Sequence, residues 1–236
     1  MKSKKTTLWF FVVYGLTIGI LLAIVILGNR AVTTLSENLP IDRRHVLILD
    51  PGHGGVDGGA TSCSGTLESQ YNLDIALRLD DLLHLLGYDT IMTRREDISI
   101  YTHGTTIAQQ KVSDLRERVR ICNETGNGIL ISIHQNTYPS EKCTGAQVFF
   151  PNTSGSKELA AKLQTRFRNL LNPGSNRREQ QGRGIYLLEQ LKIPGILVEC
   201  GFLSNPEEDA KLKTKAYQKQ LCCVIATSVI EYMTNS

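Results

Sequence analysis

The sequence predicts an α/β fold in which helices flank a twisted, mostly parallel (mixed) central sheet of about six strands. Two patterns predict it: short apolar runs bounded by glycine or proline, and stretches with helical spacing between them. A hydrophobic content of 41% is enough for a buried core. The length of 236 residues corresponds to one domain, predicted over residues 45–236, plus a short additional segment.

The N-terminal segment has an uncharged apolar stretch, 8–27, which follows three lysines. A helix of this length spans roughly 30 Å at about 1.5 Å per residue, which is the thickness of a bilayer core. We therefore expect a transmembrane signal anchor over residues 1–30 and a linker over 31–44. A cleaved signal peptide is the alternative, disfavoured because no A-x-A-like site follows the apolar stretch.

The first half of the predicted domain alternates strands with helices. The run "HVLILD" at 45–50 predicts a buried strand, and "YDTIMTR" at 88–94 predicts a second. Apolar spacing predicts a helix over 67–86, which Gly87 ends. Residues 113–125 predict another helix, with Ser113 as its cap, after a loop at 96–112.

The second half continues the alternation. Further strands are predicted at 128–134, 145–150, 184–189 and 195–200. Helices are predicted at 157–171 and from Pro206 onward.

Candidate functional groups follow the predicted strands. His53 comes shortly after the first strand, His134 ends "ILISIH" and Glu199 lies in "GILVEC", while Glu68 begins the first long helix. Ligands of such sheets gather at the carboxyl ends of parallel strands, so we expect these four side chains to converge on one edge.

Two histidines and a carboxylate are the protein ligands of many catalytic zinc sites. We therefore predict that His53, Glu68 and His134 hold Zn²⁺. Glu199, among apolar neighbours, would have a raised pKa and act as the base that moves protons. Each residue alone also has an ordinary structural interpretation, such as a loop histidine or a first-turn glutamate.

Other classes of function are disfavoured. "GHGGVDGG" matches neither G-x-G-x-x-G followed by a helix nor the P-loop pattern, so no nucleotide-cofactor site is predicted. The formal charge of +3, without a basic tract, argues against nucleic-acid binding. None of the six cysteines forms a C-x-x-C pair, and a disulfide between Cys63 and Cys143 stays open. Cys222 and Cys223 are predicted to be core residues.

Six stretches carry a family resemblance. They are "LDPGHGGVDGGA" at 49–60, "ES" at 68–69 with Asn72 after it, "MTR" at 92–94, "LRERVRICN" at 115–123, "ISIHQN" at 131–136 and "LVECGFLSNPEE" at 197–208. With these motifs the sequence resembles the zinc-dependent N-acetylmuramoyl-L-alanine amidases, the type 3 amidases, from Val46 to about Tyr232.

The resemblance implies hydrolysis of the amide between N-acetylmuramic acid and L-alanine in peptidoglycan, with the glycan strand and stem peptide as partners. It matches His53, Glu68 and His134 to the zinc ligands and Glu199 to the catalytic glutamate. Asn136 and Arg94 are expected to support the ligands from behind. Arg118 and Asn123 also match family positions, with structural hydrogen bonding as the better interpretation.

More narrowly, the chain resembles sporulation-specific amidases of the spore cortex, which begin the route to muramic-δ-lactam. This implies a membrane-anchored enzyme outside the cytoplasm, in the cell wall or forespore intermembrane space, and an activating lipoprotein partner stays open. A vegetative amidase and a non-catalytic peptidoglycan-binding protein are alternatives. A zinc carboxypeptidase is disfavoured, because its glutamate ligand usually follows the first histidine by three residues.

Overall fold

The computed structural model describes residue 9 and residues 13–26 and 45–235. The chain divides into two units, Met1–Ile41 and Asp42–Ser236, and each is described by itself. In the first unit, residues 13–26 are helical.

The predicted transmembrane anchor is not supported. Among the described residues, no helix has the length and apolar character needed to cross a membrane. The predicted membrane-anchored localisation is therefore wrong. The remainder of the predicted anchor, apart from residue 9, and the predicted linker at 31–44 lie outside the described residues.

The second unit is built on a six-stranded sheet with the order β2-β1-β3-β6-β4-β5. The strands are β1 Val46–Pro51, β2 Thr90–Met92, β3 Gly128–Asn136, β4 Gln147–Phe150, β5 Gln180–Gln181 and β6 Gly195–Phe202. β1 runs parallel to β2 and β3, and β3 runs parallel to β6. β4 is antiparallel to β6 and parallel to β5. The predicted mixed, mostly parallel sheet is confirmed.

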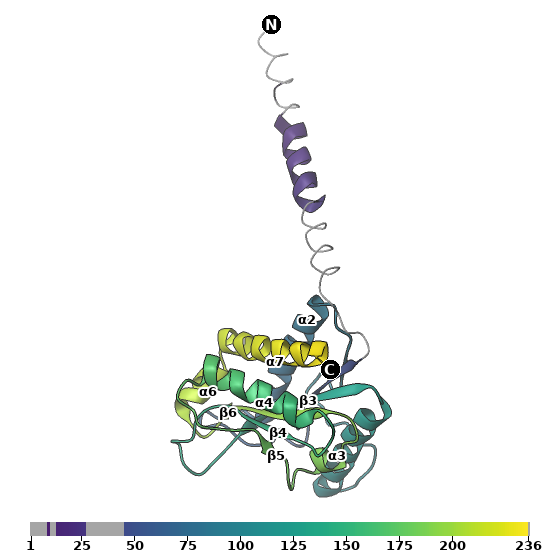
Figure 1. The fold of residues 1–236 in the computed structure, drawn as a ribbon, viewed down its shortest axis with the longest axis vertical. Coiled ribbons are helices and arrows are strands. Elements are labelled where there is room, and N and C mark those ends of the chain that lie inside the picture. The colour runs from purple at the N-terminus through teal and green to yellow at the C-terminus, as the bar shows by residue number, and fades with distance from the viewer. Residues whose placement is uncertain (1–8, 10–12, 27–44, 236) are drawn as a thin grey trace. The chain divides into compact units, whose positions relative to one another are not determined.

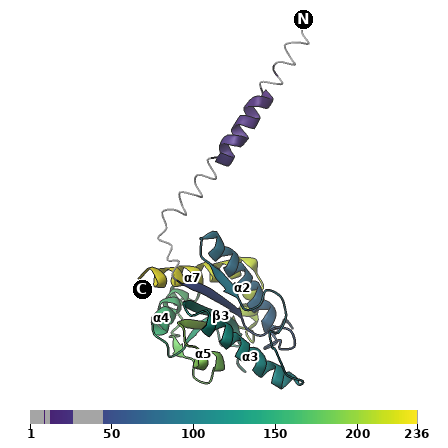
Figure 2. The same cartoon turned by 90° about the vertical axis from the view of Figure 1, so that its right-hand side faces the viewer.

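Helices cover both faces of this sheet. α2 and α4 pack against α7 and the strands, whereas α3 and α5 contact each other and, respectively, β3 and β6. Both cartoon views place β3 between α7 and α3 (Figures 1 and 2). The helices are α2 Glu68–Leu85, α3 Ile107–Glu124, α4 Ser156–Arg166 with the π-helical turn η1 Phe167–Leu171, α5 Tyr186–Gln190, α6 Pro206–Leu212 and α7 Lys215–Asn235.

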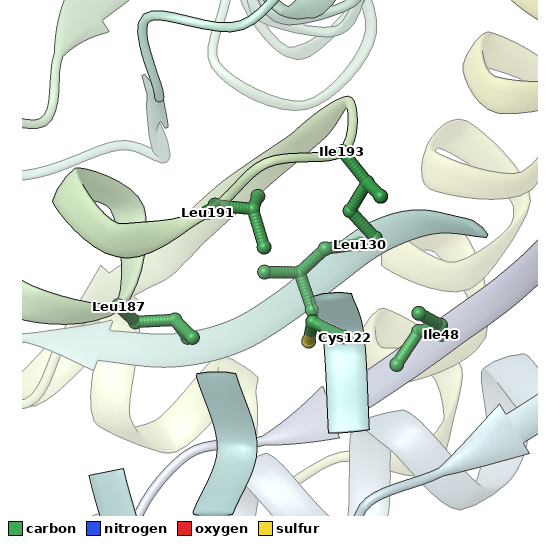
Figure 3. Packing of buried hydrophobic residues seen from close by; sticks show 6 residues of the cluster. All are labelled: Ile48, Cys122, Leu130, Leu187, Leu191 and Ile193. Atoms are coloured by element: carbon green, nitrogen blue, oxygen red, sulfur yellow. The ribbon is translucent and has the colours of Figure 1, made fainter. Parts of the chain in front are cut away.

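A hydrophobic cluster joins the sheet to α3 and α5 (Figure 3). Its six buried members are Ile48, Cys122, Leu130, Leu187, Leu191 and Ile193. Side chains alternate between the faces of a strand, so this cluster defines which strand residues point toward α3. Asp50, two residues after Ile48, and His134, four after Leu130, share that face.

One predicted strand is a helix. Residues 184–189 were expected to form the fifth strand, but Tyr186–Gln190 is helix α5 and the fifth strand is Gln180–Gln181. A short apolar run does not distinguish a strand from a buried helical turn. Here Leu187 and Leu188 are both buried, which adjacent positions on a half-buried strand would not allow.

Helix α3 begins earlier than predicted. Ser113 was expected to cap it, but the helix starts at Ile107 and Thr106 is its N-cap. The Thr106 side chain accepts a hydrogen bond from the Gln109 backbone, and the Gln109 side chain accepts one from the Thr106 backbone. This capping box stabilises two more turns of helix, which include Lys111.

The cysteines are unpaired. All six lie among the described residues and are free, so no disulfide joins Cys63 and Cys143. Cys222 is buried as predicted, but Cys223 is exposed and does not belong to the core.

Candidate metal and catalytic site

The predicted site residues converge at the carboxyl ends of the central strands. Pro51 pairs with Ile133, which brings the end of β1 next to the end of β3. His134 pairs with Glu199 on the neighbouring strand β6. Because paired residues of adjacent strands point to the same face, the His134 and Glu199 side chains share the face toward α3.

Three potential metal ligands lie together at this edge. Glu68 Oε1 is 3.3 Å from His53 Nε2 and 3.0 Å from His134 Nδ1. The two imidazole rings meet edge to face, with centroids 4.9 Å apart. One ligand atom from each of the three residues falls within 4.8 Å of the others. The His-Glu-His cluster can therefore hold a metal ion.

Glu68 is held in place on both of its oxygens. Oε2 accepts a hydrogen bond from the Ala60 backbone at 3.0 Å. Oε1 accepts one from the Gln135 backbone at 3.1 Å and one from the Asn72 amide at 3.3 Å. Burial raises the pKa of Glu68, but its contacts with the two histidines outweigh burial and hold that pKa far below its usual range. The carboxylate stays ionised, as metal binding requires.

Asp57 orients His53 from the side opposite Glu68. Its Oδ2 lies 3.0 Å from His53 Nδ1, and its Oδ1 lies 2.8 Å from Lys111 Nζ. Burial raises the pKa of Asp57, but hydrogen bonds with His53 and Lys111 hold it well below its usual range. An ionised carboxylate can only accept, so Nδ1 keeps a proton, and Nε2, which faces Glu68, is the nitrogen that would bind a cation after losing its own proton.

The His53 ring is strongly basic when no cation is bound. Burial lowers its pKa, but hydrogen bonds to Asp57 and Glu68 outweigh burial and raise it to about 9. Its backbone has φ of 60°, the left-handed region that side chains other than glycine rarely adopt. Such strain persists where surrounding contacts impose it, and it is common at functional sites.

Two buried arginines impose this loop conformation. Arg94 Nε donates to the Pro51 carbonyl at 2.9 Å and Arg94 Nη2 to the Gly52 carbonyl at 3.0 Å. Arg118 Nη1 also donates to the Pro51 carbonyl at 2.9 Å, and Arg118 Nη2 to the His53 carbonyl at 2.8 Å. Arg94 thus contacts the backbone next to His53, and Arg118 contacts that of His53 itself from helix α3.

Arg118 also neutralises a buried carboxylate beneath the site. It forms an ion pair with Asp50, whose other hydrogen bonds come from Thr93 and Ser132 at 2.7 Å each. Burial raises the pKa of Asp50, but Arg118 and these hydroxyls hold it below its usual value. A buried charge is tolerated when it is paired in this way.

Glu199 differs from the other carboxylates. It is partly buried, and its Oε2 is fully buried with no hydrogen-bond partner among the described residues. Burial raises its pKa, and the net shift, after the lowering by His134 and the raising by Glu68, brings it to about 7. A carboxyl group with a pKa near neutrality can both accept and return a proton.

Gly52 is required by close packing. A Cβ atom at this position would lie 2.1 Å from His134 Nε2. The absence of a side chain therefore lets the loop after β1 pass against the ring of His134, which keeps His53 and His134 close.

A cavity of about 430 Å³ opens beside the cluster. His53, Asp57 and His134 line it on one side, and apolar side chains such as Leu115 and Tyr186 line it elsewhere. Apolar walls with a few convergent polar groups are typical of ligand-binding sites.

Sequence reasoning missed several contacts of the site. Lys111 was placed in a loop, and the direct contact between Gln135 and Glu68 had no signal beyond its position next to His134. For Asn136, the structure shows a backbone hydrogen bond from Leu203 to its carbonyl at 2.8 Å. Its role behind the ligands stays a prediction, and Asn72 and Gln135 make the contacts with Glu68 described above.

The sequence matches the family described as N-acetylmuramoyl-L-alanine amidase over residues 47–231. Among curated relatives, the germination-specific N-acetylmuramoyl-L-alanine amidase of Bacillus subtilis is 38% identical over 199 residues, covering 84% of this chain and 83% of that protein. The amidase AmiA of Escherichia coli is 28% identical and covers 80% of this chain and 76% of its own length.

Solved structures agree with this assignment. The CwlD amidase from Clostridioides difficile, solved in complex with the GerS lipoprotein, is 34% identical with a TM-score of 0.77, covering 81% of this chain and 99% of that one.

Proposed function

The chain belongs to the N-acetylmuramoyl-L-alanine amidase family. On this basis we propose that it hydrolyses the amide bond of its substrate with the help of a zinc ion held by His53, Glu68 and His134. Glu199 is the proposed proton carrier. The enzyme hydrolyses the amide between N-acetylmuramic acid and L-alanine in peptidoglycan. The metal proposal is carried by the convergence of His53, Glu68 and His134, each with one ligand atom within 4.8 Å of the others.

The donor set fits zinc. Catalytic zinc sites use two histidines and one carboxylate, with a position left for water or substrate. The contact from His53 to Asp57 matches the carboxylate–histidine pairs that orient zinc ligands. The three hydrogen bonds to Glu68 supply the same kind of support.

A bound zinc ion would supply polarisation of the amide carbonyl and acidification of the attacking water. Glu199 would serve as the group that accepts a proton during hydrolysis, and the proposal is supported by its pairing with His134, which puts both side chains on the same side of the sheet. Its pKa near 7 then lets it return the proton to the leaving L-alanine nitrogen. The aliphatic wall of the cavity, including Leu115, would limit access of further water.

For the biological substrate we favour spore cortex peptidoglycan. Two similar proteins support this: the Bacillus subtilis relative is named germination-specific, and the solved neighbour is a CwlD amidase. On this proposal the product is muramic acid without its peptide, and the hydrolysis is the first step toward muramic-δ-lactam. A vegetative wall amidase is the alternative, and comparing the two kinds of peptidoglycan separates them.

We extend the proposal to a lipoprotein partner. The CwlD amidase of Clostridioides difficile was solved in complex with the GerS lipoprotein, and this chain covers 99% of that amidase chain. The expected outcome is co-purification of a lipoprotein with this enzyme. Equal zinc content and activity with and without that lipoprotein would argue against an activating role.

The decisive experiment uses the purified chain loaded with zinc, with spore cortex and vegetative peptidoglycan as parallel substrates. Mass analysis should detect new L-alanine amino termini and muramic acid without peptide, with the cortex cleaved faster. Release of D-alanine would instead identify a carboxypeptidase. Equal rates on the two substrates would favour the vegetative alternative.

A further inference from the structure

Helix α3 presents one face to the candidate metal site. Lys111, Asp114, Leu115 and Arg118 all line the cavity beside His53. Their spacing of three, four and seven residues places them on the same side of an α-helix. Because α3 already starts at Ile107, Lys111 lies on this face, about two helical turns before Arg118.

The two cations at the ends of this face contact the same loop at different points. Arg118 donates to the backbone carbonyl of His53 at 2.8 Å. Lys111 Nζ lies 2.8 Å from Asp57 Oδ1, and Asp57 Oδ2 lies 3.0 Å from His53 Nδ1. One rigid helix therefore holds both the backbone of His53 and, through Asp57, its ring.

We propose that Lys111 is a positioning residue of the metal site, which fixes Asp57 and through it turns His53 Nε2 toward Glu68 and His134. This inference rests on the proposed function of the His-Glu-His cluster as a zinc site. It goes further by assigning the ring orientation of His53 to a residue on another element, 58 positions along the chain from it.

The geometry favours this role over that of an ordinary surface ion pair. An exposed lysine–carboxylate pair usually contributes little, because water solvates both partners. Asp57, however, has only 23% of its side chain exposed and shares its two oxygens between Lys111 and His53. Without Lys111, Oδ1 keeps only the longer hydrogen bond from the Gly59 backbone, at 3.3 Å, which holds the carboxylate less firmly against the ring.

The neighbouring ion pair of Arg120 provides a matched control. Arg120 is on the same helix and pairs with Glu117 at 2.5 Å, and 52% of its side chain is exposed, close to the 47% of Lys111. It does not line the cavity. Arg120→Met therefore removes a comparable cation without touching Asp57.

The experiment measures the zinc dissociation constant of the full chain by competition with a chelator. Lys111→Met should weaken zinc binding about 10-fold, within the usual range for groups that support a ligand. Arg120→Met should leave the constant unchanged, and Lys111→Arg should restore most of the affinity. The cobalt-substituted enzyme gives a second measurement, because its absorption spectrum reports the geometry of the ligands.

A double-mutant cycle tests the route through Asp57. In the Asp57→Ala background, Lys111→Met should cause no further loss, because the path from Lys111 to the ring through the carboxylate is already removed. Equal and additive losses, or an unchanged zinc constant in Lys111→Met, would overturn the proposal. Failure of the unmodified chain to bind zinc would instead refute the proposed function, so the two failures are distinguishable.

Discussion

Glu199 and His134 are direct partners across the parallel strands β3 and β6. His134 is a potential metal ligand, and Glu199 has a buried oxygen, Oε2, without a hydrogen-bond partner among the described residues. The sheet itself therefore sets the spacing between the potential ligand and the proposed proton carrier, on the two inner strands of the sheet. Immediately beyond this pair the register shifts between His134 and Asn136, which ends the regular ladder at the site.

Replacing Glu199 with glutamine separates proton transfer from metal binding. Glu199→Gln keeps the size of the side chain and all contacts of the His-Glu-His cluster, but it cannot accept a proton. We expect unchanged zinc content and a fall in kcat of about 10²–10⁴-fold. Metal analysis and turnover on peptidoglycan check this. Full activity in the variant would remove Glu199 from the mechanism.

Activity should depend on pH through the same residue. Glu199 must be ionised to accept a proton, and its pKa is about 7 before a cation binds. A nearby cation lowers the pKa of a carboxyl group, so kcat/KM should fall as the pH drops through 7 or somewhat below it. A pH profile of kcat/KM measures this, and a flat profile between pH 8 and pH 5 would contradict it.

The metal-free chain should gain stability from Glu199→Gln at alkaline pH. Burial raises the pKa of Glu199 from 4.5 to about 7, so the folded state disfavours the ionised form. The contribution of Glu199 to the free energy of unfolding of the wild type is therefore fully present below pH 4.5, and it is lost as the pH rises through about 7. At pH 8 the variant should be more stable by about 1–3 kcal/mol. Urea unfolding at pH 8 and pH 4.5 measures the difference, with the exposed Glu96→Gln as the control.

A single methyl group at Gly52 should damage the metal site. The new Cβ of Gly52→Ala would overlap the His134 ring, at 2.1 Å from Nε2, so either the ring or the loop must move. We expect zinc binding to weaken at least 10-fold. Gly58→Ala in the same loop is the control, because its Cβ meets only the flexible end of Leu67, at 3.0 Å. Similar zinc affinities in the two variants would contradict this account.

The residues at the strand ends were predictable because their strands are bounded clearly. "HVLILD" is an apolar run followed shortly by His53, and "GILISIH" is an apolar run that ends in His134, where a parallel sheet collects functional groups. The run "GILVEC" places Glu199 in the same way. Strand parallelism then brings these groups together, as the pairing of His134 with Glu199 shows.

The errors arose where local patterns are ambiguous. "GIYLLE" at 184–189 fits a strand or a helical turn equally well, and only packing of Leu187 against the α3 side decides for the helix. The start of α3 depends on a reciprocal pair of hydrogen bonds between Thr106 and Gln109 within a polar stretch. Because the cap at Thr106 was not recognised, Lys111 was assigned to a loop. Its contact with Asp57, a residue far away in the sequence, was therefore not predicted.

The strand order has a consequence for the synthesis of this enzyme. β6 is the last of the described strands in sequence, yet it lies between β3 and β4 in the sheet. A nascent chain that has not reached Gly195 already contains His53, Glu68 and His134, but β4 lacks its antiparallel partner and β3 has an open edge. Such non-local pairing forms late in folding. Addition of β6 then completes the sheet and brings in Glu199, so an unfinished chain would contain the three proposed ligands without the proposed proton carrier.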